Sequence, residues 1–392
     1  DAGVSVLNSS SITLFRVAAY LNSSNGVRVQ ASTNVALQHS VIWRNGDAGV
    51  AVLSGTASIS NSVVASSVSR APLYRLGTPT NLTGNFNNLW TESNAVVAVV
   101  NVPSEQHDSV GAWHLRTQQE GRSLSVEPNF ANPTSGDFHL KTQAAEGRFN
   151  PAVGALVNDG VTSLLIDSGD PAASFTNEPT PNGGRVDIGL FGNTTEASRG
   201  LVNPWLHAAS YAAGGVARGT ATLAWVAGNF TNDSLVRVDV SRDGGHAWTL
   251  LSNDLLAVTG SVTWDTTLTA DSPAGLWRVT SLSDTSLVSQ TTNFISIRNA
   301  PLSLFVNDGS TTGDVYAAGV GAATNWVASA AQPFNSLAGA LRLYDLEPGD
   351  TVYVDSGTYA EATNVVLSRG DSGLTGQVVR LQGSTNAAMG SM

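Results

Sequence analysis

The densest group of carboxylates in this 392-residue sequence lies between positions 167 and 187. Calcium prefers carboxylate and carbonyl oxygens, so this group is compatible with a Ca²⁺ site. The alternative is turn chemistry, because Asp beside Gly accepts hydrogen bonds from backbone N–H groups. The sequence favours the turns, with no metal and no cofactor, and predicts that Arg185 pairs with one carboxylate. The members of the group are Asp167, Asp170, Glu178 and Asp187.

A second motif lies between residues 241 and 248 and fits the S-x-D-x-G-x-x-W pattern called an Asp-box. Sialidase and glycan-binding propellers carry several copies of this motif, together with an arginine cluster and a Tyr/Glu pair, whereas one copy occurs here. We therefore expect a structural β-hairpin, in which Asp243 accepts backbone N–H bonds and Trp248 is largely buried. The defining residues are Ser241, Asp243, Gly245 and Trp248.

Other catalytic patterns are missing from the sequence. No H-x-x-x-H pair and no cysteine is present, which argues against zinc, and no G-x-S-x-G motif indicates a serine hydrolase. Trp90, Trp113 and Trp326 lie in loop-like sequence and could stack on sugars, although most aromatic side chains belong to a core. The six histidines are well separated: His39, His107, His114, His139, His207 and His246.

Composition narrows the function classes further. Charged residues make up only 12% of the chain, hydrophobic residues 42%, and there are 39 glycines, which is typical of a turn-rich β protein. The net charge is −11, so the chain has no excess of positive side chains to neutralise a run of phosphates, and this argues against nucleic-acid binding. No stretch approaches 18 apolar residues, so we expect no membrane insertion.

The N-terminal part of the sequence contains an internal repeat, which predicts the strands that would position any functional side chains there. The pattern Gly-Val-x-Val recurs every 23 residues at Gly3, Gly26 and Gly49. Each repeat holds short runs that alternate apolar and polar residues, separated by Asn, Gly and Ser turns, which indicates strands. The period matches one coil of a parallel β-helix, with strand stacked on strand. Two interior columns are predicted: Val4, Val27 and Val50, and Val6, Val29 and Val52.

Two asparagines fall at equivalent turns of this repeat. Asn22 and Asn45 are separated by one period, and Asn favours such turns through left-handed backbone geometry and stacked side chains. We therefore expect an asparagine ladder along one corner of the helix.

A more specific resemblance begins at Glu127. The runs 127–140, 166–171 and 177–193 resemble the closing coils of bacterial pectin-lyase-like right-handed β-helix repeat proteins, with Glu127 and Ser168 as mild departures. The runs 333–344 and 348–359 resemble the capping helix and first coil with which the same family begins. This resemblance implies a fold and no particular activity.

Polysaccharide lyases on this fold place Ca²⁺-binding carboxylates and a basic residue on one outer face of the stacked strands. The corresponding outward positions here are Ser5, Arg28 and Ala51, and no acidic residue stacks beside Arg28. The sequence therefore assigns no catalytic residue.

An all-β chain with three domains is predicted. Residues 1–200 form the last coils and closing segment of a parallel β-helix, 201–299 an immunoglobulin-like β-sandwich with the Asp-box, and 300–392 the capped start of a second β-helix. In the last domain we expect a helix within 333–344, begun by Asn335 or Ser336, and strands at 351–354, 365–367 and 378–381.

This organisation predicts an extracellular or cell-surface structural or adhesive module, cut from a longer chain. It would form a stalk and could extend head to tail as a filament, with neighbouring repeats or other copies as partners and glycans as further ligands. The alternative function is a polysaccharide lyase or glycan-binding protein of the pectin-lyase-like class.

Overall fold

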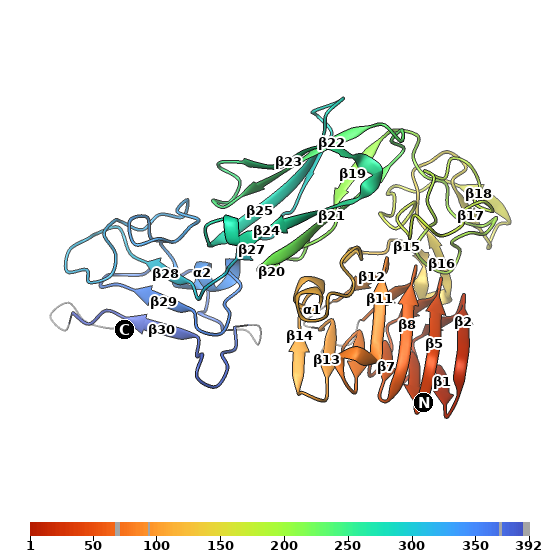
Figure 1. Cartoon of the computed structure of the whole chain (residues 1–392), viewed down its shortest axis with the longest axis horizontal. Helices are drawn as coiled ribbons and strands as arrows, with labels where there is room; N and C mark the ends of the chain where they lie inside the picture. The colour runs from red at the N-terminus through yellow and green to blue at the C-terminus, as the bar shows by residue number, and fades with distance from the viewer. Residues whose placement is uncertain (67–70, 93–94, 368–370, 387–392) are drawn as a thin grey trace.

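The computed structural model of the chain describes residues 1–66, 71–92, 95–367 and 371–386. It is nearly all β, as predicted. Figure 1 shows a stack of parallel strands at the N-terminal end, an irregular segment along one side of it, a sandwich of two sheets, and a small parallel sheet near the C-terminus.

The N-terminal stack is a β-solenoid of about four turns, consistent with a parallel β-helix. Each turn contributes one strand to each of three parallel sheets. The first sheet contains β1 (Val4–Leu7), β4 (Val27–Gln30), β7 (Val50–Val52), β10 (Tyr74–Leu76) and β13 (Ala98–Val100). The second sheet contains β2 (Ser10–Phe15), β5 (Ser32–Gln38), β8 (Gly55–Ser60) and β11 (Leu82–Asn85). The third sheet contains β3 (Ala18–Tyr20), β6 (Val41–Trp43), β9 (Val63–Ala65) and β12 (Asn88–Trp90).

The two predicted valine columns are confirmed. Val27 pairs with Val4 on one side and Val50 on the other, and the column of Val29 is aligned in the same way. Val27 is 1% exposed and Val50 2%, within one continuous hydrophobic core. A strand with a period of two, repeated every 23 residues, therefore superposes its inward side chains coil after coil.

The predicted asparagine ladder is also present. Asn22 donates from its backbone nitrogen and from Nδ2 to Asn45 Oδ1, at 3.1 and 2.8 Å, and Asn45 Nδ2 donates to the Ala19 carbonyl at 3.0 Å. The left-handed backbone falls one residue earlier than expected, at Leu21 and Arg44. The side chains thus satisfy corner groups that the sheet hydrogen bonds leave unpaired.

Two strands of the third sheet of the solenoid, β6 and β9, are buried on both faces. Ile42 and Val64 point into the solenoid core, whereas Val41 and Val63 pack outward against residues from the segment 127–200. This explains why β6 and β9 are apolar without alternation, since a strand covered on both faces has no polar side.

Residues 127–200, called the closing segment below, do not form the closing coils that the sequence predicts. Its described strands pair only in antiparallel hairpins, so it adds no turn to the stack and covers one side of it instead. The end of the stack is covered by α1 (Val110–Thr117) and by β14 (Glu105–His107), which is antiparallel to β13. The hairpin strands are β15 (Phe130–Asn132), β16 (Asp137–Leu140), β17 (Arg148–Asn150) and β18 (Ala155–Val157).

His39 lies where this closing segment meets the solenoid, and it provides a pH-dependent prediction. Burial, with the Arg16 charge in addition, lowers the pKa of His39 to about 4. Between the ordinary value of 6.5 and about 4, the unfolded chain takes up a proton that the folded chain does not, so stability falls as the pH falls through this window. Acidification from pH 6.5 to 5 should cost about 2 kcal/mol at this site. In urea unfolding measured at both pH values, His39→Gln should reduce the acid-induced loss of stability, and an equal loss in both chains would contradict this role of His39.

Residues 205–297 form a β-sandwich. Its two sheets enclose a core that includes Trp225, Trp264 and Trp277. One sheet contains β19 (Trp205–Ala208), β21 (Thr220–Gly228) and β24 (Ser261–Asp265); the other, β20 (Gly215–Ala217), β27 (Ile295–Ile297), β25 (Ser272–Ser281), β22 (Leu235–Ser241), β23 (Thr249–Leu256) and β26 (Val288–Gln290).

The C-terminal unit is a parallel sheet of β28 (Ser303–Val306), β29 (Thr351–Val354) and β30 (Arg380–Gly383), covered by α2 (Leu337–Leu343). Ser336 begins α2 by accepting the Gly339 N–H at 2.8 Å, which confirms one of the two predicted caps. The strand predicted at 365–367 is wrong: these residues are exposed and lie outside any strand. The strand predicted at 378–381 begins two residues later. Short 3₁₀ turns complete the fold: Pro79–Asn81, Pro133–Ser135, Ala257–Thr259 and Thr266–Leu268.

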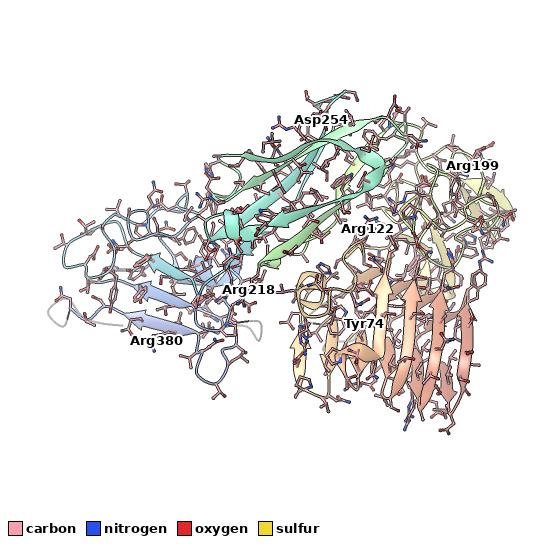
Figure 2. All side chains as sticks on the ribbon, viewed as in Figure 1. Tyr74, Arg122, Arg199, Arg218, Asp254 and Arg380 are labelled. Carbon is pink, nitrogen blue, oxygen red and sulfur yellow. The ribbon has the colours of Figure 1, made fainter. Side chains whose placement is uncertain are left out.

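The units share their cores instead of being joined by free linkers. Ala209 and Val226 of the sandwich belong to the same hydrophobic cluster as Val63 of the solenoid. Arg122 lies at this junction (Figure 2) and donates from Nη2 to Ser261 Oγ at 2.7 Å. Ala274 of the sandwich packs in turn with the core of the C-terminal unit. Relative motion of the units would therefore expose apolar surface.

Candidate metal centre

Three carboxylates converge inside the closing segment. Asp167, Glu178 and Asp187 each offer one oxygen, and these oxygens lie within 4.8 Å of one another. The residues are 0%, 5% and 1% exposed. Asp170, the fourth acidic residue predicted for the group, lies outside the cluster and accepts the Ala172 N–H at 2.9 Å.

Apolar neighbours hold the three carboxylates in place. Ile166 and Ile188, next to Asp167 and Asp187 in the chain, are buried in the cluster that covers the third solenoid sheet. Asp167 adopts a left-handed backbone, with φ of 57°. Gly183 and Gly200 line its carboxylate so closely that a β-carbon at either position would collide with Oδ2. Hydrophobic burial of the isoleucines thus carries the charged residues inward with them.

The hydrogen bonds divide the cluster into satisfied and unsatisfied oxygens. Asp187 Oδ1 accepts the Asp167 N–H at 2.9 Å and Oδ2 the Ser198 N–H at 3.2 Å. Glu178 Oε1 accepts two backbone N–H groups, from Asp187 at 2.9 Å and Asn193 at 2.7 Å. Both oxygens of Asp167 and Oε2 of Glu178 are buried without a hydrogen-bond partner. The turn interpretation therefore accounts for Asp187 and half of Glu178, and it does not account for Asp167.

Burial raises the pKa of all three groups. The pKa of Asp167 rises to about 8, through burial and then the charge of Glu178, and that of Glu178 to about 7 through burial. The pKa of Asp187 lies well above its ordinary value for the same reasons. The charge of the predicted partner, Arg185, opposes the rise in the pKa of Asp167 without cancelling it, and its guanidinium donates to the carbonyl oxygens of Ser168 and Gly169. The cluster can reach a low charge only by holding protons or a cation.

The Asp-box forms the predicted hairpin turn between β22 and β23. Asp243 Oδ1 accepts the Ala247 N–H at 2.9 Å, and Ser241 Oγ accepts the Gly245 N–H at 2.9 Å. The expectation for Trp248 is wrong, because its ring is only partly buried and lies under the Arg278 guanidinium at 4.3 Å instead of covering the core. The turn is stabilised locally, through backbone groups that its own side chains satisfy.

Asp243→Ala should lower the free energy of unfolding of the sandwich by about 1 kcal/mol, since it removes the acceptor of a turn N–H. Differential scanning calorimetry would measure this as a lower Tm, with Asp254→Asn as the control, since Asn tolerates the left-handed backbone of this exposed position on β23. Sialidase activity that disappears in the Asp243 variant would contradict the structural assignment.

The other predicted site residues do not converge. Trp113 is buried in the solenoid core, and Trp90 and Trp326 are partly buried against hydrophobic clusters. Arg28 lies on the outer face of the first sheet, between Ser5 and Ala51 as predicted. Its Nη2 donates to Gln30, and Arg75 farther along the same face pairs with Asp47 at 2.6 Å.

A histidine held between two carboxylates was not predicted from the sequence. His139 Nδ1 lies 2.6 Å from Asp137 Oδ1, and Nε2 lies 3.3 Å from Glu196 Oε2. The imidazole stacks on Phe191, with ring centroids 3.6 Å apart, beside an open pocket of about 560 Å³. The available signal was the D-x-H spacing, because residues two apart on a strand share a face. Such a group could orient a polar ligand or accept a proton.

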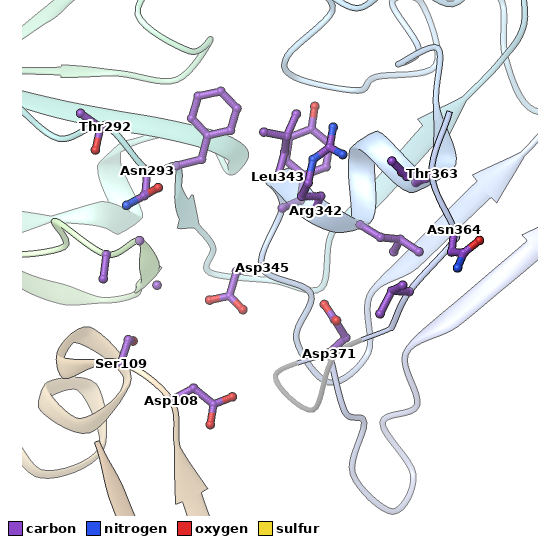
Figure 3. A pocket seen from close by; sticks show the side chains of 18 residues that line it. Asp108, Ser109, Thr292, Asn293, Arg342, Leu343, Asp345, Thr363, Asn364 and Asp371 are labelled. Carbon is purple, nitrogen blue, oxygen red and sulfur yellow. The ribbon is translucent and has the colours of Figure 1, made fainter. Parts of the chain in front are cut away.

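A larger cleft of about 820 Å³ opens where the solenoid end, the sandwich and the C-terminal unit meet (Figure 3). Asp108, Asp345 and Asp371 contribute carboxylates to it from different parts of the chain. Burial, followed by the charge of Asp371, raises the pKa of Asp345 to about 6. The acidic lining disfavours an anionic sugar in this cleft.

Comparison of the chain with protein-family models, curated proteins and solved structures found no match. None of the helices in the described ranges is both long and apolar enough to cross a membrane. The fold alone therefore gives the class, an all-β protein that contains a β-solenoid.

Proposed function

We propose that this chain is an extracellular structural or adhesive module that serves as a section of a stalk. The observation that carries this proposal is the shared packing at both junctions, where side chains of the sandwich enter the hydrophobic clusters of its two neighbours. A stalk must keep a fixed direction under load, and units that share apolar cores resist hinge motion.

The proposal includes a pectin-lyase-like, right-handed β-helix and an immunoglobulin-like sandwich. The resemblance of the runs 127–140 and 177–193 to that family supports the first, and the two packed sheets of residues 205–297 support the second. The parallel strands β28, β29 and β30 behind α2 would begin another β-helix.

Coil stacking would extend the stalk. Val4, Ile12 and Leu14 lie in the same inward columns as residues of the next coil, and they are only partly buried. A further coil, from a longer chain or from another copy head to tail, would bury these side chains and add ladder hydrogen bonds.

The second candidate is a polysaccharide lyase or glycan-binding protein of the pectin-lyase-like class. The pocket beside His139 favours it, because aromatic and hydrogen-bonding side chains lie together there. Its arginine, Arg148, is already paired with Asp159 at 2.9 Å, which weakens attraction for an anionic sugar.

Turnover separates the two functions. The whole chain would be incubated with uronate polysaccharides, with Ca²⁺ and with a chelator, while the absorbance of unsaturated products is followed. A structural module predicts no product under either condition. Ca²⁺-dependent turnover that is lost in His139→Ala or Arg28→Ala would establish the enzyme instead.

A further inference from the structure

The unsatisfied carboxylate oxygens in the closing segment call for a positive partner. Asp167 is completely buried, yet neither of its oxygens accepts a hydrogen bond, and Oε2 of Glu178 is in the same state. A buried acceptor without a donor costs free energy, and an ionised one costs more. Among the described residues, Arg185 is the cation whose charge acts on Asp167, but it donates its hydrogen bonds to the carbonyl oxygens of Ser168 and Gly169 and not to these carboxylates.

We propose that Asp167, Glu178 and Asp187 bind one Ca²⁺ ion. The spacing fits, because two oxygens on opposite sides of one calcium, each about 2.4 Å from it, are about 4.8 Å apart. The cluster lies in the closing segment, away from the outer face of the first sheet. This inference does not depend on the proposed stalk function.

The donor set selects the class of ion. All three side chains are carboxylates, and hard oxygen donors suit calcium and magnesium better than zinc or copper. Magnesium requires a near-ideal octahedron and retains several waters. Gly183 and Gly200 pack closely against Asp167 Oδ2, and calcium, unlike magnesium, accepts the irregular and bidentate carboxylate geometry of such a constrained ligand.

Binding would have a local structural effect. The three ligands come from separate points of the closing segment, and Glu178 and Asp187 already hold backbone amides of residues 187, 193 and 198. One ion would therefore link the loops around these ligands to Ile166 and Ile188, which pack on the third solenoid sheet. The solenoid coils themselves need no metal for their ladder.

The test uses the full chain treated with EDTA and dialysed. Isothermal titration calorimetry with CaCl₂ should give one site per chain, with MgCl₂ at least tenfold weaker. Asp167→Asn should weaken Ca²⁺ binding at least tenfold, and the matched control Asp170→Asn should retain it. Hydrogen exchange should show the added protection near residues 167, 187, 193 and 198.

The melting temperature distinguishes a metal ligand from a merely structural residue. Without Ca²⁺, Asp167→Asn should melt at or above the temperature of the unsubstituted chain, since a neutral amide replaces a buried carboxyl group that must otherwise hold a proton or carry an unpaired charge. With Ca²⁺, only the unsubstituted chain and the Asp170 variant should become more stable. Absence of Ca²⁺ binding by the EDTA-treated chain, or equal binding by Asp167→Asn, would overturn the proposal.

Discussion

Val27→Asp is expected to lower the free energy of unfolding of the solenoid by roughly 3–5 kcal/mol. Val27 is 1% exposed and lies between Val4 and Val50, so a carboxylate there has apolar neighbours on both sides. Urea unfolding followed by tryptophan fluorescence would measure the change. Several units contribute to such a curve, so the transition assigned to the solenoid must be separated from the others.

The matched control places the same charge on the other face of a strand. Ser5 lies one residue from Val4 and is exposed, so Ser5→Asp should change the free energy of unfolding by less than about 0.5 kcal/mol. Equal effects of Val27→Asp and Ser5→Asp would mean that the inward and outward positions are assigned incorrectly.

Asp350→Ala is expected to cost a similar roughly 3–5 kcal/mol, at the junction of the sandwich and the C-terminal unit. Asp350 is fully buried and pairs with Arg298 at 2.8 Å, and it accepts the N–H groups of Leu302 at 2.6 Å and Glu347 at 2.9 Å. Arg298 is only 7% exposed, so the substitution leaves a buried cation without its carboxylate.

A double substitution separates the charge effect from the loss of packing. Arg298→Met with Asp350→Leu removes both charges together and should recover part of the stability lost in Asp350→Ala. Calorimetry of the unsubstituted chain, Arg298→Met, Asp350→Leu and the double variant would give the coupling energy. A double variant less stable than Asp350→Ala would show that the hydrogen bonds to residues 302 and 347 matter more than the ion pair.

The repeated part of the fold was predictable because its physics is local and periodic. A 23-residue period combined with alternation fixes which valines face inward, and the Asn22–Asn45 pair follows from the same period. The cap of α2 was predictable for a similar reason, since Ser336 acts within its own turn.

The closing segment was harder to predict because its contacts join residues that are distant in sequence. Its turn-rich sequence resembles further coils, and only the apolar outer face of β6 and β9 indicates that a layer must cover the third sheet. The apolar run 365–367 alone predicts a strand, but these residues remain exposed.

The candidate metal centre was half predictable. The sequence singled out Asp167, Glu178 and Asp187 by density, but density cannot show which oxygens the turns satisfy. That depends on amides such as those of Asn193 and Ser198, which the fold brings to the cluster. The same limit concealed the contact of His139 with Glu196, 57 residues away.

The stalk proposal is tested most directly by the distance distribution between two units in solution. The chain contains no cysteine, so spin labels on Ser58→Cys in the solenoid and Ser303→Cys in the C-terminal unit, both at exposed positions, need no background removed. Pulsed electron paramagnetic resonance should give one narrow distance, which broadens when Asp350→Ala is added. A broad distribution in the otherwise unsubstituted chain would show that the units move independently, and it would contradict a stalk.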